Sequence, residues 1–237
     1  MQHLLDIFVH LDGEASWKNR DGWPTSAEVP AGTSTEHVEI YGVTRQWDKP
    51  NEVSALDLAW NGLRGNITRL HGIWAQPSLT TLQLSANKLS GYLPGAVQNL
   101  YSLKDLHIYR NFLSGPIPPE IGELRHLSSL WLFENNMTGE IPDVFSGLSR
   151  TISDVRLNSN AFTGHIPSSL SDCEKLQVLF LQRNALEGTI PEAILQRCRK
   201  LRDLRLASNR LTGPISSDVG GLRKLEVLML QHNKIGW

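Results

Sequence analysis

The chain has 237 residues and a formal net charge of -1, with 23 Lys and Arg against 24 Asp and Glu. This near balance excludes the strongly basic composition that is typical of nucleic-acid-binding domains. No apolar run approaches the roughly 18 residues of a membrane-spanning helix. Two cysteines are too few for a disulfide framework in a chain of this length. We therefore expect no nucleic-acid partner and no membrane insertion by this segment.

The first predicted element is an amphipathic helix at the start of the chain, with Leu4, Phe8 and Leu11 on its apolar face. This opening lacks a basic n-region and a small-residue cleavage site, so it does not have the pattern of a signal peptide. Four tryptophans that follow supply bulk to close the end of an apolar core, and we expect them to do so. They are Trp17, Trp23, Trp47 and Trp60.

An Asn then recurs every 24 to 26 residues to the end of the chain. The copies follow the pattern Leu-x-Leu-x-x-Asn-x-Leu-Ser/Thr-Gly-x-Ile-Pro, as in "LHIYRNFLSGPIP". A period in the twenties with this outline predicts a leucine-rich repeat solenoid. The repeated residues are Asn61, Asn87, Asn111, Asn135, Asn160, Asn184, Asn209 and Asn233.

The two apolar positions before each Asn lie two residues apart, for example Leu130 and Leu132, which is the period of a strand with one buried face. One strand per repeat makes a parallel sheet whose inner face is buried only when the coils stack. We predict an α/β fold, a right-handed curved solenoid with a parallel β-sheet on its concave face and an N-terminal helical cap.

The Asn column is predicted to be structural. Each coil must turn inside the stack just after its strand, where backbone groups need partners that water cannot supply. A carboxamide offers an acceptor and two donors, so a ladder of Asn side chains can tie adjacent turns together. A Gly column four residues further on, such as Gly91 and Gly115, fits turns that need positive φ or close packing.

The two cysteines fall in register with core Leu positions. Cys173 follows Asn160 by the same interval as Leu124 follows Asn111, and Cys198 occupies this place in the next repeat. We expect buried thiols that behave as small apolar side chains. Because they lie one repeat apart, a disulfide between them remains open.

From about residue 53 the pattern resembles the plant-type subclass of leucine-rich repeats, most clearly in "LQLSANKLSGYLP", "LHIYRNFLSGPIP" and "LFLQRNALEGTIP". The resemblance implies a second strand at the Ser/Thr-Gly-x-Ile-Pro segment and a capping region over residues 1–52. That region holds "SWKNRDGW" and "IYGVTRQW" without cysteine, and so resembles the caps of algal and other protist repeat proteins. Residues 53–237 then form eight repeats. The last one stops mid-repeat at "HNKIGW", so we expect a monomeric domain of a longer chain.

Outward positions on the sheet are the expected binding face. They alternate with the buried Leu pair, and their middle gathers aromatic side chains beside Arg, the composition of protein–protein contact sites. The alternative is that these rings only pack on one another across strands. The predicted ligand-binding residues are His107, Tyr109, Arg110, Trp131, Phe133, Glu134, Arg156, Asn158, Phe180, Gln182, Arg183, Arg205 and Met229.

No motif predicts catalysis, a cofactor or a metal site. The His residues lack metal-ligand spacing, and no nucleophile has an identifiable base partner. Asp105, Asp154 and Asp203 form a column that could bind a cation, but Arg156 and Arg205 stand two residues from two of them. We therefore expect ion pairs there.

The leading hypothesis is a non-catalytic module that binds a protein or peptide, as the sensor domain of a larger receptor or signalling protein. The alternative is a structural scaffold or spacer within a multidomain kinase or GTPase, because the related repeats commonly precede such domains. The missing signal peptide and the reduced cysteines favour the cytoplasm. Two glycosylation sequons, at Asn66 and Asn136 on positions expected at the surface, favour secretion.

Overall fold

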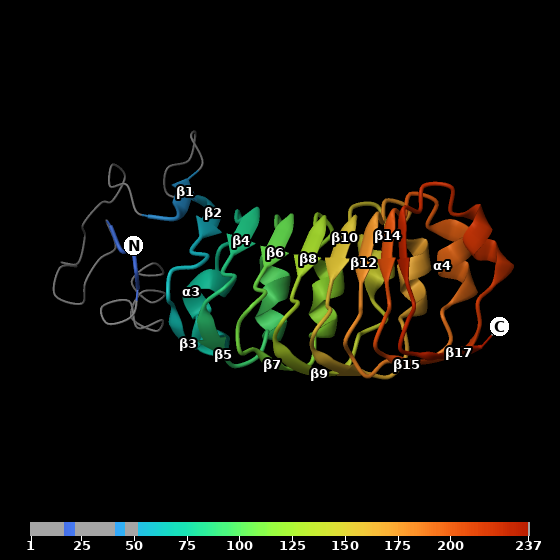
Figure 1. The fold of residues 1–237 in the computed structure, drawn as a ribbon. Coiled ribbons are helices and arrows are strands. Elements are labelled where there is room, and N and C mark those ends of the chain that lie inside the picture. The colour runs from blue at the N-terminus through green and yellow to red at the C-terminus, as the bar shows by residue number, and fades with distance from the viewer. Residues whose placement is uncertain (1–16, 22–40, 46–51, 237) are drawn as a thin grey trace.

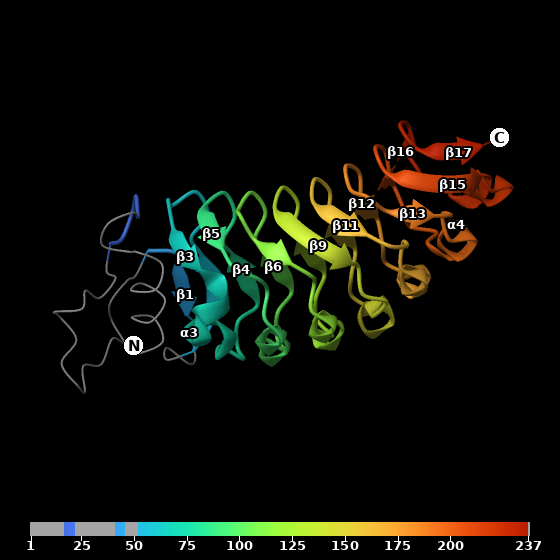
Figure 2. The same cartoon turned by 90° about the horizontal axis from the view of Figure 1, so that it is seen from below.

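A computed structural model describes residues 17–21, 41–45 and 52–236. The predicted helix around Leu4, Phe8 and Leu11 lies outside these residues, as do Trp23 and Trp47. The coils stack side by side from one end of the molecule to the other (Figure 1), and the stack curves and twists along its length (Figure 2). The predicted leucine-rich repeat solenoid with a long parallel sheet is confirmed.

Each coil contributes one strand to a nine-stranded sheet in the order β1-β2-β4-β6-β8-β10-β12-β14-β16. All neighbours pair in parallel except β1 (Val43–Arg45), which is antiparallel to β2 and was not predicted. The other strands are β2 (Val53–Asp57), β4 (Thr81–Gln83), β6 (Asp105–His107), β8 (Ser129–Trp131), β10 (Asp154–Arg156), β12 (Val178–Phe180), β14 (Asp203–Arg205) and β16 (Val227–Met229).

A second set of strands runs along one flank, below the long sheet in Figure 1. These strands start just after each Asn and most of them end before the Ile-Pro, so they lie slightly earlier in the repeat than the resemblance implied. They form three small sheets, β3-β5, β7-β9-β11 and β13-β15-β17. Their bounds are β3 (Arg64–Asn66), β5 (Lys88–Ser90), β7 (Ser114–Gly115), β9 (Asn136–Glu140), β11 (Ala161–Thr163), β13 (Glu187–Gly188), β15 (Arg210–Pro214) and β17 (Lys234–Gly236).

Short helices cover the side of each coil opposite the long sheet. In four coils the Pro of the repeat, such as Pro118, is the residue before the helix; its ring fixes φ and it lacks an N–H to satisfy. The apolar residue before this Pro is buried in three of these coils, as in Ile117, and partly buried at Ile190. The helices are η1 (Ile67–Arg69), α3 (His71–Trp74), η2 (Gly95–Asn99), η3 (Pro119–Glu123), η4 (Phe145–Leu148), η5 (Ser168–Asp172), α4 (Glu192–Arg197) and η6 (Ser217–Gly221).

The Leu columns form one continuous core between sheet and helices. Leu130 is fully buried, whereas Leu228 in the same column is 39% exposed, because no described coil packs beyond β16. Trp17 is buried as predicted, but the prediction for Trp60 was wrong: it is 58% exposed. Trp60 lies in the turn after β2 with φ 58°, which points its side chain away from the core, and Trp74 is the buried tryptophan there instead.

The Asn side chains form a spine through the stack. Asn111 Oδ1 accepts from the Leu89 N–H at 3.0 Å, and its Nδ2 donates to the carbonyls of Leu84 and Ile108 at 3.0 and 3.1 Å. At the N-terminal end, Asn61 exchanges two 2.7 Å hydrogen bonds with the Asn19 backbone, which extends the ladder into the cap. The four asparagines from Asn160 onward are half-buried rather than buried.

The Gly column and the cysteines lie where the sequence indicates. Gly91 and Gly115 have φ of 88° and 72°, and a Cβ on Gly91 would collide with Asn66 Oδ1. Cys173 and Cys198 are buried free thiols. Burial raises the pKa of the Cys173 thiol to about 12 and that of Cys198 to about 11.

Candidate binding face

The parallel register places one side chain per coil in a straight row across the long sheet. His107 on β6 pairs with Trp131 on β8, and the row continues through the next strands without a shift. We call the five residues of this row the central ladder. They are His107, Trp131, Arg156, Phe180 and Arg205.

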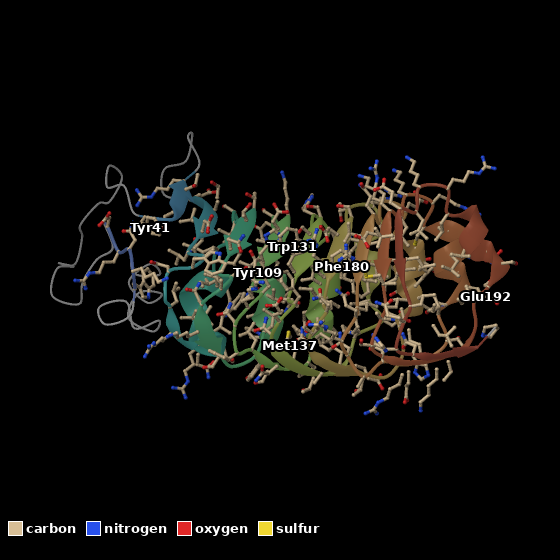
Figure 3. All side chains as sticks on the ribbon, in the orientation of Figure 1. Tyr41, Tyr109, Trp131, Met137, Phe180 and Glu192 are labelled. Atoms are coloured by element: carbon tan, nitrogen blue, oxygen red, sulfur yellow. The ribbon has the colours of Figure 1, made fainter. Side chains whose placement is uncertain are left out.

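Members of the central ladder stack face to face. The His107 and Trp131 rings lie 4.0 Å apart between centroids at 13°. The Arg156 guanidinium carbon lies 4.3 Å above the Trp131 ring and 5.0 Å from Phe180, whose ring is also 4.3 Å from the Arg205 guanidinium. Contacts of this kind contribute about 0.5–1 kcal/mol each at exposed sites. Figure 3 shows Trp131 and Phe180 on this face.

Two Asp residues orient the arginines. Asp154 accepts from Arg156 Nε and Nη2 at 2.9 and 2.8 Å, and Asp203 holds Arg205 at the same distances. Such a bidentate fork fixes the plane of the guanidinium, so that it can lie over a ring. The hydrogen bond from Arg205 to Asp203 also raises the pKa of that guanidinium. These are the ion pairs that the sequence favoured over a cation site.

His107 is part of a chain of hydrogen bonds across neighbouring strands. Ser85 Oγ donates to Gln83 Oε1 at 2.6 Å, Gln83 Nε2 lies 3.4 Å from His107 Nδ1, and His107 Nε2 lies 2.6 Å from Ser129 Oγ. The tautomer with the N–H on Nε2 and the lone pair on Nδ1 gives each of these side-chain hydrogen bonds a donor and an acceptor. Burial lowers the pKa of His107, against the opposing effect of nearby Asp105. The sequence did not predict that Ser85 and Ser129, although on the outward face, would be buried by these contacts.

A second stack and an ion pair lie beside the ladder. Tyr109 and Phe133 stack at 4.3 Å and 8°, and Tyr109 lies 6.0 Å from Trp131. Arg110 Nε donates to Glu134 Oε2 at 2.8 Å, and this bond raises the pKa of Arg110. Both residues have positive φ, so they belong to the turn after the strand rather than to the strand.

Next to the second stack, toward the C-terminal coils, the same face is hollowed by about 430 Å³. Five predicted residues line this hollow. Five further lining residues were missed, although all of them occupy the same repeat positions as predicted residues: Ser159, Ala207, Ser208, Gln231 and His232. The predicted lining residues are Glu134, Asn158, Gln182, Arg183 and Met229.

The aromatic rings of this face are less exposed to solvent than the predicted aromatic patch would be. Tyr109, Trp131, Phe133 and Phe180 are all half-buried, because their rings cover one another. Two buried polar atoms, Trp131 Nε1 and Gln182 Oε1, have no hydrogen-bond partner among the described residues. Native structures contain few such atoms, and each needs an explanation.

The two sequons differ in their surroundings. Asn136 is exposed, but Asn66 is half-buried, and its Oδ1 accepts from the Thr68 N–H at 2.9 Å to cap η1. Asn66 is therefore less accessible than Asn136, because its side chain is engaged in this cap. Within the described part of the chain, no group of three His, Cys, Asp or Glu side chains could hold a metal ion, and no helix is long and apolar enough to span a bilayer.

These repeats define a class, the leucine-rich repeat solenoid. The Leucine Rich Repeat family model matches residues 78–100, 102–124, 126–148, 175–196 and 200–222. The chain is a leucine-rich repeat protein of the plant type. A comparison with curated proteins finds no match.

Solved plant receptor structures have the same fold. The ectodomain of the Arabidopsis thaliana membrane receptor kinase GASSHO1/SCHENGEN3, in complex with CASPARIAN STRIP INTEGRITY FACTOR 2, is 38% identical with a TM-score of 0.73 over 76% of this chain and 21% of that one. The Arabidopsis receptor kinase HAESA, in complex with a peptide hormone and a co-receptor, is 29% identical with a TM-score of 0.73 over 99% and 41%. The plant peptide hormone receptor RGFR1 is 33% identical with a TM-score of 0.67 over 76% and 32%. The present chain thus spans between a fifth and about two fifths of these chains.

Proposed function

We propose that this chain is a non-catalytic recognition module that binds a protein or a peptide on its concave face. Its fold is that of receptor ectodomains, a class typically made of binding modules. The neighbours named above were solved with peptide ligands or a co-receptor. By this reasoning the chain is the sensor segment of a larger receptor or signalling protein, with residues 1–52 as its cap and residues 53–237 as its repeats.

The observation that carries the proposal is the combination of amphipathic side chains with unused polar groups on one face. Trp, Tyr and Arg dominate the binding energy of protein contacts. The central ladder presents ring edges and guanidinium groups, because its ring faces are already covered. The hollow beside it offers amide and hydroxyl groups, and Gln182 Oε1 there is without a donor. A ligand is therefore expected to lie across the ladder and reach into the hollow.

The test replaces the aromatic anchors and probes capture of peptides. Random peptides displayed on phage are selected on the unaltered chain, and the enriched peptides are measured against the triple variant Trp131→Ala, Phe133→Ala, Phe180→Ala. Removing a hot-spot aromatic lowers the binding free energy, and each 1.4 kcal/mol lost weakens binding about tenfold. We therefore expect the triple variant to bind the enriched peptides at least about tenfold more weakly. Circular dichroism and thermal unfolding establish that the variant is folded.

Three aromatics outside the concave face supply a matched control. Tyr92, Tyr101 and Phe112 are 53%, 60% and 57% exposed, so replacing them with Ala removes similar ring area. The control variant is expected to bind the selected peptides like the unaltered chain. If selection enriches no peptides, or if the enriched peptides bind the concave variant with unchanged affinity, the proposed function is wrong.

A structural spacer is the second candidate function. The observation that favours it is the mutual stacking of the rings, which would stiffen the array without any ligand. For a spacer, the concave triple variant would lower the unfolding temperature while no peptide is captured by the unaltered chain. The two candidates therefore give opposite results in the same experiment.

A further inference from the structure

A strip of unpaired cations lies along the edge where the chain passes from the convex helices to the long sheet. It occupies the loops over residues 149–153, 174–177, 199–202 and 223–226, one loop per coil. Every cation of the strip is exposed. We call the strip the basic rim, and its members are Arg150, Lys175, Arg199, Lys200, Arg223 and Lys224.

The basic rim carries an excess of positive charge. None of its six cations makes an ion pair within residues 52–236. Glu174 is the one carboxylate in these loops without an ion pair in this part of the chain, since Glu226 lies 3.6 Å from Arg202. The whole chain carries a formal charge of -1, so this local excess is a property of the edge. In Figure 3, nitrogen-ended side chains extend from the upper edge over the C-terminal coils.

A hollow of about 740 Å³ lies directly beside the rim, on the helical side. Three cations line it, Arg197, Arg199 and Lys200, together with the hydroxyl-bearing Ser146, Ser149 and Ser171 and the carboxylates of Asp172 and Glu174. The Asp172 carboxylate is already engaged, because it accepts from Ser146 Oγ at 2.6 Å and pairs with Arg197 at 3.3 Å. Arg199 is held in place, because its Nη1 donates to the Gly221 carbonyl at 2.8 Å. Fixed cations beside hydroxyl donors make a suitable seat for carboxylate groups.

From this arrangement we infer that the basic rim binds an acidic, extended segment of a partner polypeptide. The four loops span three coil steps, roughly 14 Å at the strand spacing, so a single small anion would cover only part of the rim. An extended peptide needs roughly four to five residues to cover that length. Its neutral residues can face Glu174, whereas a uniformly charged polymer would place an anion there.

The composition of the rim argues against other polyanions. Its four loops contain no aromatic side chain, so they offer no platform on which nucleic-acid bases or sugar rings could stack. They also present no exposed large apolar side chain that could insert into a bilayer, the usual complement of basic residues in interfacial binding. Complementary charge of this kind mainly accelerates encounter and adds specificity.

The experiment measures binding of a fluorescent peptide of alternating Glu and Ser to the whole 237-residue chain at low salt. The rim variant carries Arg150→Glu, Lys175→Glu, Lys200→Glu and Lys224→Glu, one reversal per coil. The control variant carries Arg64→Glu, Lys88→Glu, Arg210→Glu and Lys234→Glu, four exposed cations on the flank strands. Both variants have the same net charge, so a difference between them reports position. We expect the rim variant to bind at least about tenfold more weakly, and the control within about twofold of the unaltered chain.

Equal losses in the two variants, or no binding of the Glu-Ser peptide to the unaltered chain, would overturn the inference. So would tighter binding of polygalacturonate or of phosphatidylserine vesicles than of the peptide, since either would identify another class of partner. The concave variant Trp131→Ala, Phe133→Ala, Phe180→Ala should retain the Glu-Ser peptide. The rim and the proposed concave site can therefore fail independently.

Discussion

The Asn spine and the central ladder are both rows with one residue per coil, but they differ in how many of their hydrogen-bonding groups have partners. The spine repeats one residue, and each interior carboxamide uses its acceptor and its donors within the protein. The ladder changes residue at each coil, and two polar atoms, one in the ladder and one beside it, lack a hydrogen-bond partner within the described part of the chain. A row whose hydrogen bonds are all internal serves the fold, whereas a varied row with unused groups is available to a ligand.

The largest effect on the unfolding free energy is expected from a substitution in the Asn spine. Asn135→Ala removes the acceptor of the Leu113 N–H and the donor to the Ile108 and Leu132 carbonyls, which lie at 3.0, 3.0 and 3.1 Å. Leaving these buried groups unpaired should cost about 4 kcal/mol of unfolding free energy, measured in urea. The adjacent, exposed Asn136 gives the control: its change to Ala should stay within about 0.5 kcal/mol. Equal costs for the two variants would contradict the structural role of the spine.

A second prediction concerns the thiols behind the spine. A pKa raised to about 12 for Cys173 and about 11 for Cys198 leaves little thiolate at pH 8 in the folded state. Alkylation of Cys173 should then be at least about a thousandfold slower in the native chain than in urea, where the thiol pKa returns to about 8.5. Mass spectrometry after timed iodoacetamide treatment measures both rates. Native labelling at the unfolded rate would show that this part of the interior is open.

The smallest effect on the unfolding free energy is expected from the titration of His107, at the N-terminal end of the ladder. Because burial lowers the pKa of His107, the unfolded chain binds a proton at higher pH than the folded chain does. The unfolding free energy should therefore fall as the pH decreases below about 6.5, the unperturbed value for His, until the folded imidazole also protonates. His107→Phe preserves a stacked ring but cannot titrate, so it should lack this part of the pH dependence in urea titrations. An unaltered pH dependence in the His107→Phe variant would contradict this role of His107.

The repeat period predicted the long sheet, the buried columns and the Gly turns, because each of these follows from stacking identical coils. The same logic could not predict the left-handed turn residues before each Asn. Arg110, Glu134 and Arg183 adopt φ of 55°, 53° and 59°, although none of them is Gly. The spine bonds of the following Asn hold these turns, so tertiary contacts override local preference there. The burial of Trp60 was wrongly predicted for the same reason, because Trp60 is also a turn residue with positive φ before an Asn.

For the candidate site, the sequence predicted which residues share a face but not how they contact one another. Register alone brings His107, Trp131 and Arg156 together, since residues at the same position on adjacent parallel strands lie side by side. Whether the rings would face solvent or one another depends on side-chain torsions, which the pattern does not specify. The hydrogen-bonded chain through Gln83 and Ser129 likewise joins three coils and has no signature within any single repeat.

The sequence by itself determined the coil. Its period, its Leu columns and its Asn positions specify one repeating unit, because a unit that cannot bury its apolar face alone must stack on copies of itself. Only the tertiary structure decided how the varied positions combine across coils. Stacking distances, the two hollows and the basic rim arise between residues about 24 apart in the sequence, and their geometry depends on the curvature and register of the assembled stack.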